Sequence, residues 1–377
     1  MKGYFRKRGD KWSFTVDIGK DPITGKRRQK TVSGFKTKKE AQAACAELIA
    51  KIEKEGYIEP ARLTLAEFAE NVIKGEIEPN YRPNTTHIYI QTLRLIKETI
   101  GHIELSKLNA LHIQHFVKYL REKGLKNGTI KLHISKLKRI LRFATKWKLI
   151  TYDLAAAIEM PKTTEKNMKY WTFDECMKFL EKTKNEQYYL VFLLTIFTGL
   201  RRGEVLGIPI HNVDFENNTI KIDQQITVVN GKARIEKVLK SESSHRVIDV
   251  PSDIMHQLKR HIHEKKKLFF ELGIQNKHNL VFTTSKGTPI YPGNVSARFR
   301  KLCKELGMKP IPFHGLRHSH ATMLAEMKEN VHAIAERLGH SSTTITNEMY
   351  IHLTNKMKSS LSEKLEAIYN ETMKNHG

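Results

Sequence analysis

Cysteine, long apolar runs and acidic side chains are all scarce in this chain of 377 residues. Its three cysteines, Cys45, Cys176 and Cys303, lie far apart, so they form neither the spacing of a zinc site nor a disulfide framework, and they fit a reducing compartment. The longest apolar run, residues 188–197, is too short for a membrane-spanning helix, which needs about 20 residues. The N-terminus also lacks the apolar segment of a secretory signal. We therefore expect a soluble cytoplasmic protein with no membrane partner.

Basic residues greatly outnumber acidic ones. The chain holds 65 Lys and Arg against 40 Asp and Glu, which gives a formal net charge of +25. Solubility does not require so large a charge, which favours a polyanionic partner such as DNA, RNA or an anionic membrane surface. Hydrophobic residues make up 40% of the chain, enough to build folded cores and to exclude wholesale disorder. The length predicts two or three domains.

Residues 1–58 alternate apolar and polar side chains in three segments, which predicts a small three-stranded sheet followed by a helix. Pro22 and Gly25 suit a hairpin turn between two of the strands. Up to Lys39 the segment carries thirteen Lys or Arg against three Asp. A sheet this basic can lie in a DNA groove, and the alternative is a solvated basic surface over a small core. The candidate DNA contacts are Arg6, Lys7, Arg8, Arg27 and Arg28.

Residues 62–155 are predicted to be entirely helical. The clearest helix covers residues 130–148, where apolar side chains recur every three or four positions from Ile130 to Ala144. Seven basic residues and no acid surround that apolar stripe. This favours contact with DNA phosphates over an ordinary surface helix, which remains the alternative. The candidate contacts are Lys131, Lys138, Arg139, Arg142 and Lys146.

Residues 156–171 are polar and contain Pro161, which predicts a linker. Residues 172–377 mix helical segments with alternating strands, and the Asn230–Gly231 pair predicts the turn of a β-hairpin. We therefore predict a multidomain, mainly helical fold with small sheets. Its parts are an N-terminal three-stranded sheet with a helix, an all-helical domain and a mixed α/β domain.

Four segments of the last domain place polar side chains beside apolar helices, where a core does not require them. They are T-G-L-R-R-G-E, K-S-E-S-S-H-R, H-G-L-R-H-S-H and L-G-H-S-S-T-T-I-T-N-E-M-Y. Each has an ordinary explanation when taken alone, such as a charged helix end or an exposed lysine. The residues that stand out in them are Arg201, Lys240, His314, Arg317, His340 and Tyr350.

His314 and His318 lie four residues apart on one helical face, a spacing that metal ligands use. No glutamate lies between them as in H-E-x-x-H, and a third ligand would have to come from elsewhere. Arg317, on the same short segment, would repel a dication and suits an anion instead. We expect no metal site and no cofactor.

The four segments, taken in order, resemble the motifs of the tyrosine recombinases, the phage-type integrases encoded by temperate phages and integrative conjugative elements. The matching features are T-G-L-R-x-x-E, a hairpin lysine, H-x-L-R-H, L-G-H-S and a late tyrosine. Residues 1–58 resemble the arm-site DNA-binding domain, residues 62–155 the core-binding domain and residues 172–377 the catalytic domain. The resemblance implies a site-specific recombinase that integrates or excises a mobile element.

The resemblance also implies which groups bind the scissile phosphate. Arg201 and Arg317 are bidentate donors for its non-bridging oxygens, and His340 donates a further hydrogen bond. Such donors stabilise the charge of the transition state, which is why the reaction needs neither a metal ion nor ATP. Glu204, one turn after Arg201, either orients that arginine or caps charge on a helix.

The remaining roles that the resemblance implies concern proton and strand transfer. Tyr350 attacks the phosphodiester and forms a 3′-phosphotyrosine. His314 serves as its base or positions the phosphate, and Lys240 protonates the leaving 5′-oxygen. Lys240 precedes an S-x-R-x-I strand, and Lys237 is the competing assignment for the catalytic lysine.

The partners implied are double-stranded DNA attachment sites, with core and arm sites, and three further copies of the chain. The apolar stripe in residues 354–372 predicts a C-terminal helix that docks on a neighbouring protomer of a tetramer, with packing on its own chain as the alternative. An excisionase and a host DNA-bending protein are further candidate partners, and the bound enzyme would be nucleoid-associated. The rival functions are a non-catalytic DNA-binding regulator, a type IB topoisomerase-like enzyme and a zinc hydrolase.

Overall fold

The computed structural model describes most of the chain. The described residues are 2–20, 27–55, 63–150, 153–156, 158–160, 169–237 and 245–339. The chain divides into two compact units, residues 1–165 and 166–377. Within the described ranges, no helix combines the length and the apolar character that crossing a bilayer requires.

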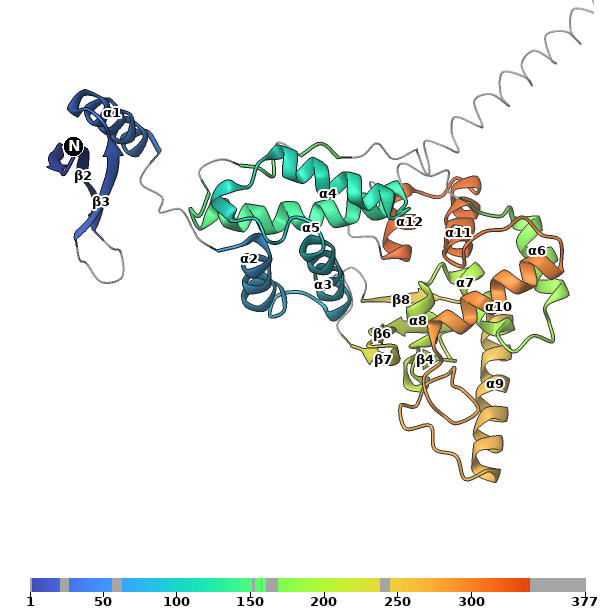
Figure 1. Cartoon of the computed structure of the whole chain (residues 1–377). Coiled ribbons are helices and arrows are strands. Elements are labelled where there is room, and N and C mark those ends of the chain that lie inside the picture. The colour runs from blue at the N-terminus through green and yellow to red at the C-terminus, as the bar shows by residue number, and fades with distance from the viewer. Residues whose placement is uncertain are drawn as a thin grey trace, which may run out of the picture. The chain divides into compact units, whose positions relative to one another are not determined.

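The first unit begins with an antiparallel sheet whose strand order is β1-β2-β3. One helix covers one face of this sheet (Figure 1), and Phe14, Val16, Ala41 and Cys45 are buried between them. The elements are β1 (Gly3–Arg8), β2 (Lys11–Lys20), β3 (Arg27–Phe35) and α1 (Lys38–Glu55). Among the described residues, no helix packs on the opposite face of this sheet.

The rest of the first unit is helical, as predicted. Its longest helix, α5, buries the predicted stripe, and Thr92 on α3 is hydrogen-bonded to its His133 over 2.9 Å. Thr64 and Glu67 form a reciprocal capping box that fixes the start of α2. The elements are α2 (Leu65–Val72), the π-helical turn η1 (Ile73–Ile77), α3 (Pro83–Lys97), the 3-10 turn η2 (Leu105–Lys107), α4 (Ala110–Glu122) and α5 (Asn127–Lys146).

The second unit surrounds two small antiparallel sheets with helices (Figure 1). The sheets have the strand orders β4-β5-β8 and β6-β7. The helices are α6 (Phe173–Lys182), α7 (Tyr189–Thr198), α8 (Arg202–Leu206), the 3-10 turn η3 (Ile210–Asn212), α9 (Ser252–Glu271), α10 (Pro292–Glu305), α11 (His314–Glu326) and α12 (Val331–Leu338). The strands are β4 (Val213–Asp214), β5 (Thr219–Ile222), β6 (Gln225–Val229), β7 (Lys232–Glu236) and β8 (Arg246–Asp249).

An aromatic cluster forms the centre of the second unit. Trp171 is fully buried, with its ring centroid 5.1 Å from that of Phe179 and 5.4 Å from that of Phe299. Its backbone N–H donates to Ser319 Oγ over 2.8 Å, and its indole N–H donates to the carbonyl of Lys309 over 2.9 Å. The last residue of the predicted linker thus lies in this core, where it holds the segment before α6 against α11.

The elements confirm the predicted fold class of a mainly helical, multidomain chain with small sheets. The predicted hairpin is β6–β7, in which Val229 pairs with Lys232. Asn230 and Gly231 form its two-residue turn with φ values of 51° and 73°, the left-handed conformation that such a turn requires.

Helix α8 lies very close to strand β6, and a glycine makes this possible. A Cβ atom on Gly203 would lie only 2.6 Å from the carbonyl oxygen of Ile226, so no larger residue fits without a backbone shift. This close packing fixes the short helix α8, whose N-cap residue is Arg201.

Candidate active site

The end of α7 determines where Arg201 lies. Helix α7 is almost entirely apolar and buried, and it ends at Gly199 in a left-handed conformation with φ of 66°. A Cβ atom on Gly199 would lie 2.6 Å from the ring of His320 and 2.5 Å from Leu338, so the position requires glycine. Two residues later, Arg201 caps α8 with its backbone N–H donating to Glu204 Oε2 over 2.9 Å.

The Arg201 side chain is held on two sides and remains partly accessible. Nη1 donates to Glu204 Oε1 over 2.7 Å, and Nη2 donates to the carbonyl of Gly339 over 2.8 Å. The side chain of Arg201 is 30% exposed, whereas that of Glu204 is 1% exposed. The buried carboxylate of Glu204 therefore holds the Arg201 guanidinium in place, while part of that guanidinium stays accessible to solvent.

Arg317 lies deeper, on α11, with only 2% of the residue exposed. Its Nη1 donates to the carbonyl of Gly199 over 2.8 Å and its Nη2 to the carbonyl of Leu338 over 2.7 Å. Burial, followed by the positive charge of Arg201, lowers the pKa of Arg317 to about 9, so the guanidinium stays charged at neutral pH. The backbones of T-G-L-R and L-G-H thus both hold this one side chain.

The local charge balance favours an anion. The guanidinium groups of Arg201 and Arg246 flank the buried carboxylate of Glu204, and that of Arg317 lies within their electrostatic range. Burial favours the neutral form of Glu204, but the charge of Arg246 and then that of Arg201 outweigh burial and lower its pKa. Three cationic groups around one carboxylate leave an excess of positive charge that suits a phosphodiester.

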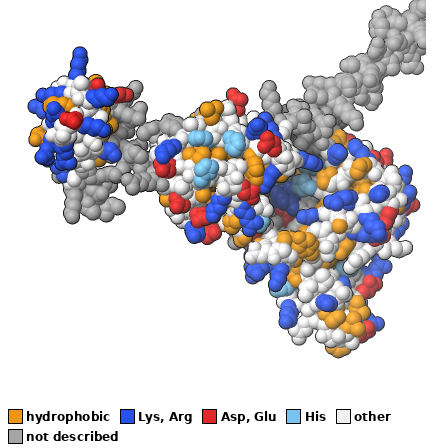
Figure 2. Space-filling view, in the orientation of Figure 1, with side chains coloured by type: hydrophobic (Ala, Val, Ile, Leu, Met, Phe, Trp, Pro, Cys, Tyr) orange, Lys and Arg blue, Asp and Glu red, His pale blue; other side chains and the backbone are white. Residues whose placement is uncertain are grey.

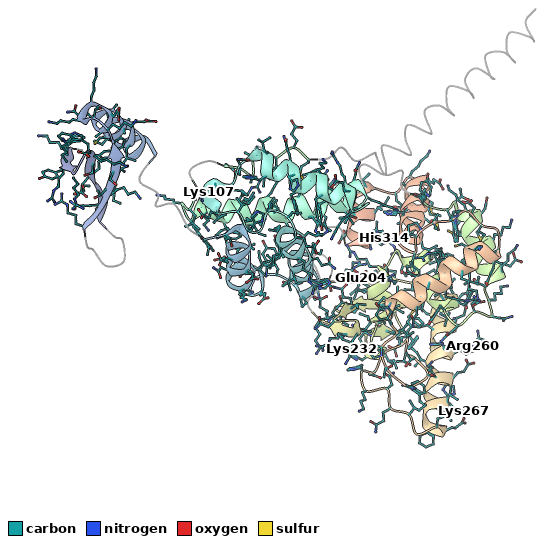
Figure 3. The ribbon with its side chains drawn as sticks, in the orientation of Figure 1. Lys107, Glu204, Lys232, Arg260, Lys267 and His314 are labelled. Atoms are coloured by element: carbon teal, nitrogen blue, oxygen red, sulfur yellow. The ribbon has the colours of Figure 1, made fainter. Side chains whose placement is uncertain are left out.

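His314 occupies the first turn of α11 and keeps part of its surface open to solvent. Its ring lies edge-on to that of His318, with 4.8 Å between the centroids (Figure 3 labels His314 and Glu204). Desolvation by the surrounding protein, and then the charges of His318 and Arg317, lower the pKa of His314 to about 4. Desolvation and the neighbouring charges both lower the pKa of His314. The imidazole is therefore neutral at physiological pH.

The other two histidines of this segment lie further inside. His320 is 3% exposed, its Nδ1 lies 2.9 Å from the carbonyl oxygen of Ile196, and its Nε2 accepts from Arg337 Nε over 3.3 Å. Burial and then the charge of Arg337 lower the pKa of His320 to about 3. His318 is half-buried beside His314. Among the residues that the structure describes, no group of three His, Cys, Asp or Glu side chains is arranged to hold a metal ion.

Three of the predicted catalytic residues fall outside the described ranges. They are Lys240, His340 and Tyr350, and the predicted helix at 354–372 does so as well. Lys237, the competitor of Lys240, is described and lies exposed just after β7. Among the described residues, the fold brings together Arg201, the N-cap residue of α8, with His314 and Arg317 of α11.

Sequence reasoning did not single out Arg246 as a site residue. Its side chain is 7% exposed, and Nη2 donates to Glu204 Oε2 over 3.0 Å while Nε donates to the carbonyl of Arg337 over 2.8 Å. A signal was present in strand β8, because alternation puts Arg246 on the same face as the buried Ile248 and leaves Val247 62% exposed. A basic residue on the core face requires a buried partner.

The strand register sorts the predicted contacts in the N-terminal sheet. Arg6 pairs with Ser13 and Arg8 with Lys11, on the face opposite α1. Lys7 pairs with Trp12 and lies on the α1 side, although all three basic side chains are exposed. Figure 2 shows Lys and Arg side chains gathered on the visible face of this part of the chain.

The remaining predicted contacts of the first unit differ in their surroundings. In the sheet, Arg27 is paired with Asp17 over 2.6 Å, and the side chain of Arg28 lies outside the described residues. On α5, the exposed basic residues are Lys131, Arg139, Arg142 and Lys146. Lys138 is half-buried, and its ammonium donates to the carbonyl of Ile158 over 2.8 Å. Its charge is therefore engaged by its own chain.

Comparison with known families accounts for nearly the whole sequence. Residues 168–357 match the model of the phage integrase family, residues 4–52 match the Arm DNA-binding domain, and residues 64–186 match the phage integrase SAM-like domain. The chain belongs to the phage integrase family. The predicted class of enzyme, a site-specific recombinase that cleaves and rejoins DNA, is confirmed.

Individual proteins similar to this chain are integrases as well. The chain is 28% identical over 365 residues to the ICEBs1 integrase of Bacillus subtilis (strain 168), covering 94% of this chain and 96% of that protein. Its fold is similar to that of the Tn1549 transposon integrase in complex with transposon right end DNA, with 21% identity, a TM-score of 0.68 and coverage of 81% of this chain and 100% of the other. It is also similar to a lambda integrase tetramer bound to a Holliday junction, with 18% identity, a TM-score of 0.57 and coverage of 92% and 94%.

Proposed function

We propose that this enzyme integrates and excises a mobile element by cutting and rejoining attachment-site DNA with Tyr350 as the nucleophile. The observation that carries the proposal is the arrangement of Arg201 and Arg317, each held by backbone carbonyls of the L-G-H segment that leads to His340. Two fixed guanidinium groups beside a neutral His314 provide phosphate binding and a proton acceptor in one place.

The proposed reaction has two transesterification steps. The Tyr350 oxygen attacks phosphorus and forms a 3′-phosphotyrosine, while Lys240 gives a proton to the departing 5′-oxygen. The 5′-hydroxyl of a partner strand then attacks the phosphotyrosine, releases Tyr350 and restores a phosphodiester. One phosphate ester is exchanged for another at each step, so ATP is not consumed.

In the proposed division of labour, residues 1–58 bind arm sites, residues 62–155 bind core sites and residues 172–377 carry out catalysis, with residues 156–171 as the linker. The matches to the Arm DNA-binding and SAM-like domains support the first two assignments. We also propose that four protomers assemble on DNA through the segment 354–372, which the tetrameric state of the lambda integrase relative supports. An excisionase and a host bending protein are proposed as accessory partners.

The function is tested by covalent trapping without divalent metal ions. The full chain is incubated in EDTA with nicked duplexes from the ends of its own element, and the products are separated on denaturing gels. We expect a protein–DNA adduct, because the cationic side chains replace the metal ion of other phosphoryl-transfer sites. Tight binding without an adduct would favour the regulator, and loss of cleavage in EDTA would favour the zinc hydrolase.

The register of β1 supplies a matched pair of variants for arm-site binding. Arg6 lies on the sheet face opposite α1 and Lys7 on the α1 side, yet both are exposed and basic. Because base readout requires side chains on the face that enters the groove, Arg6→Ala should weaken arm-site affinity about 5-fold or more, and Lys7→Ala less than about 3-fold. Fluorescence anisotropy on duplexes tiled across the element ends measures both. Equal losses would mean that the sheet contributes only diffuse charge.

A further inference from the structure

Glu204 is shared by two arginines that come from different elements. Its Oε1 accepts from Arg201 Nη1 over 2.7 Å, and its Oε2 accepts from Arg246 Nη2 over 3.0 Å. Helix α8 supplies Glu204, and β8, which follows Lys240 in the sequence, supplies Arg246. The carboxylate is 1% exposed, so these bonds form where water does not screen them.

A second link joins the same groups through α12. Arg246 Nε donates to the carbonyl of Arg337 over 2.8 Å, and Arg201 Nη2 donates to the carbonyl of Gly339 over 2.8 Å. The contacts therefore close a ring from Arg201 through Glu204, Arg246 and the end of α12 back to Arg201. His340 follows that helix end directly in the sequence.

The two arginines of this ring differ in what they can reach. The side chain of Arg201 is 30% exposed, whereas that of Arg246 is 7% exposed and faces the buried carboxylate. A guanidinium carries five N–H donors, and the bonds to Glu204 and Gly339 engage two donor nitrogens of Arg201. Arg201 can therefore bind a phosphate, while Arg246 lies on the buried side of Glu204 and Arg201.

We infer that Arg246 is a positioning residue for strand cleavage. By donating to Oε2 of Glu204, Arg246 prevents a bidentate pair between the side chains of Arg201 and Glu204. The Arg201 guanidinium therefore stays turned toward the phosphate. The Arg246 guanidinium also holds the end of α12 that precedes His340. Oε2 of Glu204 also accepts from the backbone N–H of Arg201 over 2.9 Å, but a carboxylate oxygen can accept two hydrogen bonds. Without Arg246, Oε2 could accept a second bond from the Arg201 side chain, and the resulting bidentate pair would draw that guanidinium inward. This inference rests on the proposed function of Arg201.

The test is a double-mutant cycle between Arg246 and Glu204 in the full chain. Arg246→Met should lower the single-turnover rate of strand cleavage about 10-fold to 100-fold, the usual cost of losing a group that orients a reacting residue. The Kd for DNA should change less than about 2-fold, because Arg246 donates to Glu204 and to the carbonyl of Arg337, and most of the affinity comes from phosphate contacts elsewhere. The double variant with Glu204→Gln and Arg246→Met should cleave no more slowly than the slower of the two single variants.

Two further variants separate positioning from general stability. Arg246→Lys restores the charge but not the fork that reaches both Glu204 and the carbonyl of Arg337, so it should recover only part of the rate. Arg260→Met removes the same side chain from an exposed position on α9, away from Glu204 (Figure 3), and should leave the rate unchanged. Unfolding temperatures of all variants show whether the rate merely follows stability.

The inference is overturned if Glu204→Gln and Arg246→Met lower the cleavage rate by independent factors. It is also overturned if Arg246→Met lowers the affinity for DNA by the same factor as the cleavage rate. A readout without DNA keeps it distinct from the proposed function. In protein labelled with 15N-arginine, rotation of the Arg201 guanidinium should change in Arg246→Met and stay as in wild type in Arg260→Met. If the unaltered chain forms no adduct, the proposed function fails, and this NMR comparison still decides the role of Arg246.

Discussion

Replacing Tyr350 with phenylalanine is expected to remove the covalent protein–DNA adduct completely and to leave the affinity for DNA within about 3-fold. The substitution deletes one oxygen atom, which is the atom that would attack phosphorus. It removes no charge, and the net charge of +25 that draws the chain to DNA is unchanged. Trapping on nicked duplexes in EDTA measures the adduct, and a gel-shift titration of the same duplexes measures the affinity.

A second tyrosine provides the control for this experiment. Tyr189 lies half-buried on α7, where it packs against the core and where burial raises the pKa of its phenol. Its hydroxyl is therefore even less ready to ionise than a free tyrosine with a pKa of about 10. Tyr189→Phe should form the adduct at the rate of the unaltered chain. An adduct that survives in Tyr350→Phe would move the nucleophile to another residue, with Tyr369 the next to substitute.

Periodicity predicted several elements of the fold, but not α10. The apolar stripe from Ile130 to Ala144 belongs to α5, and the Asn230–Gly231 pair forms the turn between β6 and β7. These features are local, because a helix or a two-residue turn is specified within a few positions of the chain. The sequence could not place the residues that pack against each element, which lie far away along the chain.

The described part of the active site illustrates the same limit. The order of the motifs predicted which residues matter, but no spacing rule predicts that Arg317 donates to the carbonyl of Gly199, 118 residues earlier. Arg246 escaped attention because its partner Glu204 lies 42 residues away. Alternation in β8 could have flagged Arg246, since it shares a face with the buried Ile248.

The basic helix α5 shows why a charge pattern alone cannot assign DNA contacts. A helical wheel groups Lys138 with its exposed neighbours, such as Arg142. The fold instead returns residue Ile158 to the side of α5, where its carbonyl accepts from the Lys138 ammonium. The position of that carbonyl depends on the path of the chain after the helix, which helical periodicity does not describe. Contact with phosphates stays a prediction for the exposed members of the set.

Replacing Arg317 with lysine is expected to slow strand cleavage on the order of 100-fold to 1,000-fold, the cost of losing one fixed donor to a transition-state oxygen. Arg317 bridges the carbonyls of Gly199 and Leu338 over 2.8 Å and 2.7 Å, and so joins the T-G-L-R and L-G-H segments. Lysine keeps the charge, but a single ammonium cannot hold both carbonyls and a phosphate oxygen in one plane. Single-turnover cleavage of nicked duplexes measures the loss.

The choice of lysine limits the structural damage at this buried position. Methionine would leave two buried carbonyls without their donor, whereas lysine can still serve one of them. We therefore expect Arg317→Lys to remain folded and to bind DNA within about 3-fold of the unaltered chain, because most of the affinity comes from phosphate contacts elsewhere. Arg260→Lys, at an exposed position on α9, makes the same substitution where no effect is expected. If both variants cleaved at the rate of the unaltered chain, Arg317 would be a structural clamp between the two carbonyls and not a phosphate ligand.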